Sequence, residues 1–230
     1  MKVAYCVSGE MRSMDIWDLH KKYFVTPYNA DIFLHTWKWN SDGLSDAPFR
    51  ERNNWTPFVY RNEFAIQTIN PSSYIIEDKE KIQADYCTDI QSIKQYTEFV
   101  PRDRPFYMWR SWALSFFCCD VIQKYDILIK SRTDIKFNEQ LPIVLEEIED
   151  NTVYVPYGND GAGIPDGMSL CDWFAFGKYD SMKIYFSLYH YVKTYLLNGI
   201  PLHPEIMLRH HLQTNNIQIK RFHFNYELYR

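Results

Sequence analysis

The sequence predicts an α/β protein with a mostly parallel central sheet flanked by helices. Three observations lead to this class: short apolar runs rich in strand formers, longer segments with apolar residues at helical spacing, and the alternation of the two along the chain. No internal repeat, low-complexity stretch or obvious linker interrupts the 230 residues. We therefore expect one domain over residues 1–230.

The first half of the chain predicts a β-α-β-α-β arrangement. The strands are short apolar runs at 3–7, 31–37 and 74–77, and the helices between them cover 14–24 and 62–69. A turn over 27–29 precedes the second strand, and the polar residues 40–54 predict a long loop. His35 lies inside an apolar strand, so we expect a buried, hydrogen-bonded histidine rather than a ligand.

The second half continues the alternation. The clearest helix covers 107–124, where apolar residues from Trp109 to Ile122 recur at intervals of three and four. The remaining predicted elements, in chain order, are a strand at 126–130, helices at 141–148, 181–197 and 204–212, and strands at 152–155, 173–176 and 217–224. Ser181 is the expected N-cap of its helix, and the Gly-rich residues 158–167 predict a loop.

Composition narrows the function classes. The net charge of -4 argues against a general nucleic-acid binder, which needs a basic face for phosphates. The 46% hydrophobic share allows a sizeable packed core. Aromatic residues make up 17% of the chain, which fits either a tyrosine-rich core or a groove where sugars stack on rings.

Location is predicted from cysteines and apolar runs. None of the five cysteines forms a C-x-x-C pair, which favours reduced thiols in the cytoplasm. No segment has the features of a secretory signal, and no run approaches the roughly 20 apolar residues of a membrane span. We expect no transmembrane segment and at most peripheral membrane association.

The strongest local signal is the segment YDILIKSRTDIKF at 125–137. A buried strand delivers Asp134 to the point where the apolar run stops, and its carboxylate suits Mn²⁺ or Mg²⁺ bridging two phosphates. Arg132 lies two residues earlier, on the same side of the strand, and would hold a phosphate or pair with Asp134 itself. A surface ion pair is the alternative.

Ser8, Gly9 and Arg12 follow the first strand. Ligands of parallel sheets sit at the carboxyl ends of the strands, so we expect Ser8, Gly9, Trp37 and residues 132–134 to surround one crevice. Gly9 would permit close backbone approach and Arg12 would reach a diphosphate, unless this is an ordinary turn with a solvated arginine.

Four segments in this order resemble GT-A-type glycosyltransferases of bacteria and large viruses, including those near the WavE lipopolysaccharide-synthesis family. The segments are KVAYCVSGEMR, DIFLHTW, YDILIKSRTDIKF and DWFAFG. The resemblance implies a GT-A (Rossmann-like) fold, with residues 1–137 binding a nucleotide sugar and 138–230 binding the acceptor. It also implies that Asp134 contacts the metal, although Arg132 stands where the family often has an aspartate.

The resemblance suggests three further residues. Asp172, at the start of DWFAFG, would be the general base that takes the proton of the acceptor hydroxyl, with Asp166 in the preceding loop as second choice. A turn-capping aspartate is the alternative. His203 would be a late histidine ligand of the metal or diphosphate, unless it belongs to a solvated helix face.

The sequence thus predicts a glycosyltransferase that moves a sugar from a nucleoside-diphosphate sugar to a polysaccharide, glycan or glycolipid acceptor. Two alternatives stay open: a nucleotidyltransferase on a similar fold, and a non-catalytic carbohydrate-binding or assembly protein. The segment SGEMRS is poor in the glycine and basic residues that a nucleotidyltransferase carries after its first strand. The chain has no G-x-G-x-x-G, Walker A lysine or G-x-S-x-G motif.

Overall fold

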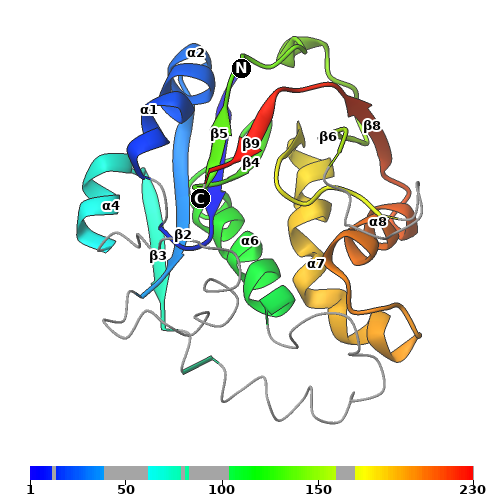
Figure 1. Cartoon of the computed structure of the whole chain (residues 1–230). Helices are drawn as coiled ribbons and strands as arrows, with labels where there is room; N and C mark the ends of the chain where they lie inside the picture. Colours follow the sequence, from blue (N-terminus) through cyan, green and yellow to red (C-terminus); the bar gives the residue numbers. More distant parts are fainter. Residues whose placement is uncertain (12–13, 39–61, 79–80, 83–103, 159–168, 230) are drawn as a thin grey trace.

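A computed structural model of the chain describes residues 1–11, 14–38, 62–78, 81–82, 104–158 and 169–229. Arg12, Asp166, the predicted loop over 40–54 and nearly all of the loop over 158–167 lie outside these residues. The described part is an α/β structure around a seven-stranded sheet with strand order β3-β2-β1-β4-β7-β6-β8 (Figure 1).

The sheet is mostly parallel, as predicted. Its strands are β1 (Val3–Ser8), β2 (Asp31–Trp37), β3 (Ser73–Glu77), β4 (Ile127–Arg132), β6 (Thr152–Pro156), β7 (Ala175–Lys178) and β8 (Gln218–Phe222). The first four are mutually parallel, and β6 is parallel to β8. Only β7 runs against both of its neighbours, β4 and β6. The amino end of β7 therefore lies at the edge where the other strands have their carboxyl ends.

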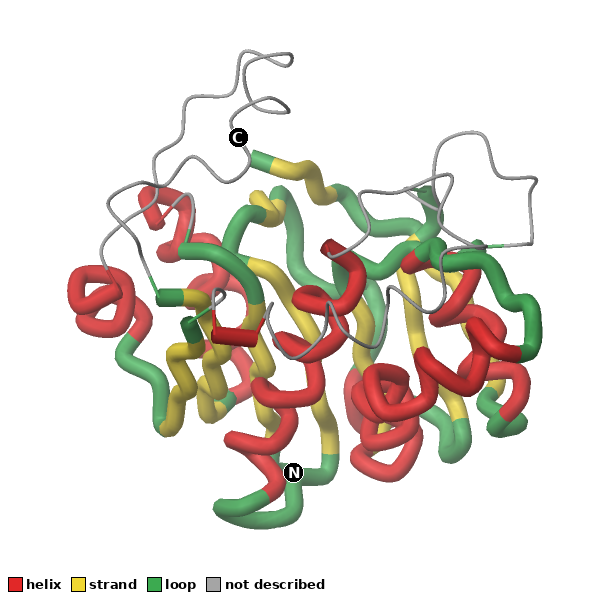
Figure 2. Tube along the Cα trace, turned by 90° about the horizontal axis from the view of Figure 1, so that it is seen from below, coloured by secondary structure: helices red, strands yellow, loops and turns green. Residues whose placement is uncertain are grey.

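Helices cover both faces of the sheet (Figures 1 and 2). On one face α6 (Arg104–Asp120) packs on β1, β2 and β3, and α7 (Tyr179–Leu197) packs on β4, β6 and β7. Next to α7, α8 (Pro204–Thr214) contacts β8. The other face carries α1 (Trp17–His20), α2 (Thr26–Tyr28) and α4 (Asn62–Ile69). Among the described residues, no helix is both long and apolar enough to cross a bilayer.

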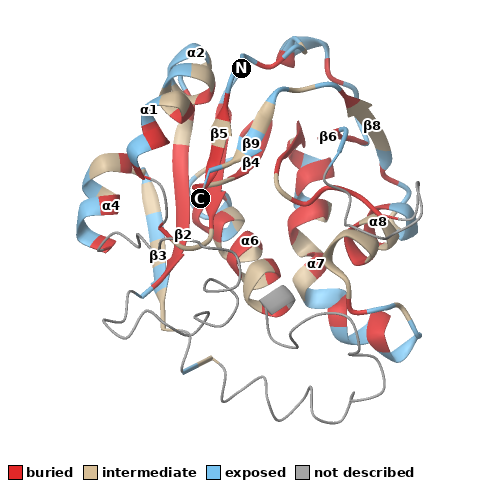
Figure 3. Cartoon of the chain, in the orientation of Figure 1, coloured by how far each residue is buried: buried red, intermediate tan, exposed pale blue. Residues whose placement is uncertain are grey.

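Two cores follow from the alternation of side chains along the central strands. Ala4 and Cys6 face α6 and α7, together with Trp109 and Trp112. Val3, Tyr5 and Val7 face the opposite side, where Trp17 and Phe24 pack. Figure 3 shows the burial concentrated in the central strands. Strands from both halves of the chain join this one sheet, so the division at residue 137 into donor and acceptor halves stays a prediction.

The predicted helix at 14–24 is helical but irregular, and the turn predicted over 27–29 is wrong in part. A 3₁₀ turn, η1 (Met14–Ile16), leads into α1, a π-helical stretch, η2 (Lys21–Val25), and then α2. Pro27 stands at the start of α2, directly after the π-helical stretch η2. The chain turns only at Asn29, with φ of 46°.

The helix predicted over 141–148 is wrong. Only a 3₁₀ turn, η4 (Leu145–Glu147), forms, because Val144 and Ile148 on either side are extended. Leu141, Leu145 and Ile148 are nevertheless all buried in the core under α1. In the sequence, three buried apolar residues at near-helical spacing look the same as the apolar face of an amphipathic helix.

Several element boundaries also differ. The helix predicted to reach residue 124 ends at Asp120, so Val121 and Ile122 are exposed rather than part of its apolar face, and Phe117 inside it is exposed as well. Ser181 is not an N-cap, because α7 already begins at Tyr179 and the capping position is Lys178. A two-stranded antiparallel sheet, β5 (Ile135–Phe137) with β9 (Tyr226–Leu228), was not predicted.

Candidate functional site

The carboxyl edge of the sheet brings together the ends of β1, β2, β3 and β4. These strands end at Ser8, Trp37, Glu77 and Arg132. Because β7 is antiparallel, the residues that precede it, including Asp172, also arrive at this edge. The topology thus joins two predicted site residues, Arg132 and Asp172, that are 40 positions apart in the sequence.

Gly9 needs glycine for its backbone. Its φ is +120°, and its N–H donates a hydrogen bond to the carbonyl oxygen of His35 at 3.2 Å. Among the residues that the structure describes, a Cβ built at Gly9 would meet nothing within 4 Å, so the constraint comes from the backbone conformation. The neighbouring Ser8 is buried. Within the described part of the chain, this turn lets the backbone at the end of β1 approach a ligand closely.

Arg132 and Asp134 form a two-point ion pair. The Arg132 Nε and Nη2 atoms lie 2.8 and 2.7 Å from the two carboxylate oxygens of Asp134. The Asp134 side chain is 4% exposed, against 25% for Arg132. Burial opposes the positive charge, but the Asp134 carboxylate outweighs it and raises the pKa of Arg132. Of the two predicted roles of Arg132, the structure shows the pairing with Asp134, and the role in holding a phosphate stays a prediction.

Lys130 is a functional candidate that the sequence prediction missed. It is fully buried in β4, on the same strand face as Arg132. Its ammonium group lies 4.3 Å from the ring centroid of Trp112 and donates a hydrogen bond to the backbone carbonyl of Asp172. Burial lowers the pKa of Lys130, although the Asp172 carboxylate acts against this. The signal was present in the sequence as a lysine that ends a buried apolar run.

Asp172 is buried next to these cations. Burial raises the pKa of its carboxyl group to about 6, and the negative charge of Glu205 adds to the effect. The positive charges of Lys130 and Arg132 lower the pKa again, but by less. A carboxylate that titrates this close to neutrality can accept a proton from a hydroxyl group that is being deprotonated.

Two aromatic side chains complete this enclosed region. The guanidinium of Arg132 lies 5.9 Å from the ring centroid of Trp173. The Tyr185 ring stacks on Trp112, with 5.4 Å between centroids, and its buried hydroxyl has no hydrogen-bond partner within the described part of the chain. Burial raises the pKa of Tyr185, and the negative charge of Asp172 adds to it. Lys130, Arg132, Asp134, Asp172 and Tyr185 are called the β4 cluster below.

His203 and Glu205 stand at the start of α8. The His203 Nδ1 atom is 2.8 Å from a carboxylate oxygen of Glu205. The backbone carbonyl of Glu205 accepts a hydrogen bond from the N–H of Leu170 at 3.1 Å, which ties the segment before Asp172 to this helix. His203 thus has an acidic partner of its own.

The two residues predicted to hold a metal, Asp134 and His203, each contact another side chain in this structure. Both oxygens of Asp134 are taken by Arg132, and His203 contacts Glu205. Across the residues that the structure describes, no group of three or more His, Cys, Asp or Glu side chains is arranged to hold a metal ion.

A second polar group lies at the same edge, at the ends of β2 and β3. His35 is buried, and its Nδ1 and Nε2 atoms lie 2.6 Å from the Ser111 hydroxyl and 3.3 Å from Glu77. Arg110 donates two hydrogen bonds to Glu77, at 2.7 and 2.6 Å. Burial would raise the pKa of Glu77, but these partners lower it to about 2. The prediction that His35 is a buried, hydrogen-bonded histidine is confirmed.

Comparison with known proteins adds no further information on the function of this site. The sequence matches no protein-family model and no curated protein.

Proposed function

We propose that this chain is a glycosyltransferase, which moves a sugar from a nucleoside-diphosphate sugar to a hydroxyl group of a glycan or glycolipid acceptor. The observation that carries the proposal is a buried aspartate, Asp172, beside two cations, Lys130 and Arg132, at the carboxyl edge of a mostly parallel sheet. This edge is where ligands of such sheets bind. A carboxylate base and adjacent positive charge are the two groups that sugar transfer from a diphosphate needs.

Asp172 acts in the proposed reaction as the general base. The acceptor oxygen forms a bond to C1 of the sugar, while the bond between C1 and the diphosphate oxygen breaks. The electron pair of that bond leaves with the diphosphate, and the hydroxyl proton passes to Asp172. Burial supports this role because it raises the proton affinity of the carboxylate.

Arg132 supplies positive charge for the leaving diphosphate, and Lys130 adds to it in its protonated form. Cations fixed in a site of low dielectric stabilise charge that develops on a leaving group more strongly than mobile cations in water do. Asp134 orients the guanidinium of Arg132 through two hydrogen bonds. Gly9 supports the same assignment, because the open space above it admits a nucleotide close to the backbone at the end of β1.

A divalent cation enters this proposal as an additional requirement to be tested. If Mn²⁺ or Mg²⁺ takes part, Asp134 would have to exchange at least one hydrogen bond with Arg132 for the metal. The ion would then supply charge neutralisation to the diphosphate that the bound donor brings.

A thermal-shift screen tests the proposal. UDP, GDP, CMP and dTDP are added to the whole chain, each with and without Mn²⁺. Since a ligand that binds only the folded state raises its melting temperature, one of these nucleotides should shift the Tm. Arg132→Met should reduce the shift, whereas Arg209→Met on α8 serves as control. A Tm that none of the nucleotides changes would contradict a nucleotide-sugar enzyme and favour a carbohydrate-binding or assembly protein.

A further inference from the structure

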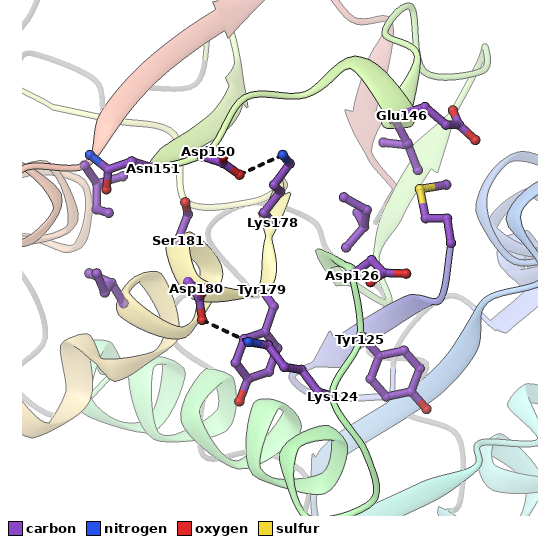
Figure 4. Close-up of a pocket in the computed structure, with 15 residues that line it drawn as sticks. Lys124, Tyr125, Asp126, Glu146, Asp150, Asn151, Lys178, Tyr179, Asp180 and Ser181 are labelled. Atoms are coloured by element: carbon purple, nitrogen blue, oxygen red, sulfur yellow. Dashed lines mark hydrogen bonds and ion pairs between the residues drawn. The ribbon is translucent and has the colours of Figure 1, made fainter.

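A cavity of about 600 Å³ lies at the opposite edge of the sheet from the β4 cluster. It is lined by the segment that enters β4, the turn before β6 and the first turn of α7 (Figure 4). The reversed direction of β7 explains the position. The carboxyl end of β7 lies at this edge, and the chain passes from Lys178 into α7 with no residue between. A strand-to-helix junction therefore points the amino end of a helix into the cavity.

The first turn of α7 presents hydrogen-bond donors. The helix has 19 residues, and Lys178 at its N-cap position provides no side-chain capping bond. The N–H of Tyr179 donates to the backbone carbonyl of Asp126 at 3.0 Å, but the next N–H groups of a first turn have no acceptor within their own helix. Together with the helix dipole, such groups favour an anionic ligand.

Ser181 is an independent indication of a ligand. Its side chain is 2% exposed, and within the described part of the chain its hydroxyl has no hydrogen-bond partner. Figure 4 shows this hydroxyl directed into the cavity, towards Asp150 and Asn151. A buried hydroxyl without a partner is costly, and a ligand oxygen at this position would satisfy it.

Both signs of charge surround the cavity, and they are unevenly placed. Lys178 pairs with Asp150 at 2.7 Å, and Lys124 pairs with Asp180 at 3.5 Å. Asp126 and Glu146 also line the cavity, and Figure 4 shows them on the other side from Ser181. One Asp126 oxygen accepts a hydrogen bond from the backbone N–H of Lys2 at 2.6 Å.

We propose that this cavity binds a small zwitterion. Its anionic group lies against the first turn of α7, where it accepts hydrogen bonds from N–H groups that have no acceptor within the helix and from Ser181, with Lys178 close by. Its amino group faces the carboxylates of Asp126 and Glu146. Asp126 and Glu146 explain why a zwitterion fits better than a simple anion, because their carboxylates repel negative charge in that half of the cavity.

Isothermal titration of the whole chain with three probes tests this proposal. Phosphoethanolamine carries both charges, whereas inorganic phosphate and ethanolamine each carry one. We expect phosphoethanolamine to bind at least about tenfold more tightly than either single-charge probe. Equal affinity for phosphate and phosphoethanolamine, or no binding of any probe, would overturn the proposal.

Variants locate the two ends of the ligand. Ser181→Ala should weaken phosphoethanolamine about fivefold, the size of one hydrogen bond. The control is Ser187→Ala on the same helix, whose hydroxyl already bonds to the carbonyl of Ile184 at 2.8 Å. Asp126→Asn with Glu146→Gln should weaken phosphoethanolamine and strengthen phosphate. If Ser181→Ala has no effect, or if the double variant changes both probes in the same direction, the assignment is wrong.

This site is separate from the proposed glycosyltransferase centre. The nucleotide-dependent Tm shift should be unchanged in Ser181→Ala, so failure of one proposal leaves the other intact.

Discussion

The two edges of the sheet use charged residues in opposite ways. At the carboxyl edge Lys130 and Asp172 are buried. Burial lowers the pKa of Lys130 and raises the pKa of Asp172, which favours the neutral form of each side chain. At the amino edge the pair Lys178–Asp150 has side-chain exposures of 39% and 87%, and water solvates both groups. Burying charged groups costs free energy, so their presence at one edge of the sheet indicates a functional role. Groups with shifted pKa values are frequent at reaction sites.

The largest loss of stability is expected when a buried ion pair is broken, and a much smaller one when an exposed pair is broken. Asp134→Ala leaves the Arg132 guanidinium, only 25% exposed, without its two-point partner. Loss of one member of a buried pair costs about 3–5 kcal/mol of the free energy of unfolding. Urea unfolding of Asp134→Ala and of Asp150→Ala at the other edge measures the contrast. Equal, small losses in both variants would remove the distinction between the two edges.

A smaller effect is expected from the backbone at the carboxyl edge. Gly9→Ala should destabilise the protein by about 1–3 kcal/mol, because a φ of +120° is strained for any residue with a Cβ even where space is free. Urea unfolding also measures this loss. A variant as stable as the natural chain would show that the turn after β1 relaxes and is not fixed for a ligand.

The pH dependence of sugar transfer tests the role of Asp172 at the carboxyl edge. Asp172 must be deprotonated to act as base, so activity should rise with pH through its raised pKa, near pH 6. The positive charge of Lys130 lowers that pKa, so Lys130→Met should move the rising limb to higher pH, by about one unit. The control is Lys136→Met, since Lys136 pairs with Glu227 outside the cluster. A limb that stays in place, or moves to lower pH, would exclude Asp172 as the titrating base.

Much of the fold could be predicted from the sequence, because buried strands and amphipathic helices leave strong periodic patterns. The strands at 3–7 and 31–37 and the helix at 62–69 were found nearly to the residue. The helix predicted over 141–148 failed because Leu141, Leu145 and Ile148 owe their spacing to anchoring a loop in the core. Local patterns do not separate these two causes.

The candidate site was harder to predict, because it depends on strand direction. The segment DWFAFG indicates a strand but not its orientation, and only the antiparallel placement of β7 brings Asp172 beside β4. Lys130 was missed because a lysine at the end of an apolar run looks like a strand end exposed to solvent. The pairing of Arg132 with Asp134 was foreseen as one of two outcomes from their two-residue spacing. Arg12 and Asp166 lie outside the described residues, so their predicted roles stay predictions.

The most direct test of the central claim is the turnover of Asp172→Asn. It is measured with the sugar donor whose nucleoside diphosphate raises the Tm, beside Asp18→Asn, which changes an exposed aspartate on α1. We predict that transfer by Asp172→Asn falls about 10²–10⁴-fold while donor affinity stays nearly unchanged, because the base acts on the acceptor hydroxyl. Turnover equal to that of the natural chain would contradict the account and remove Asp172 from the reaction.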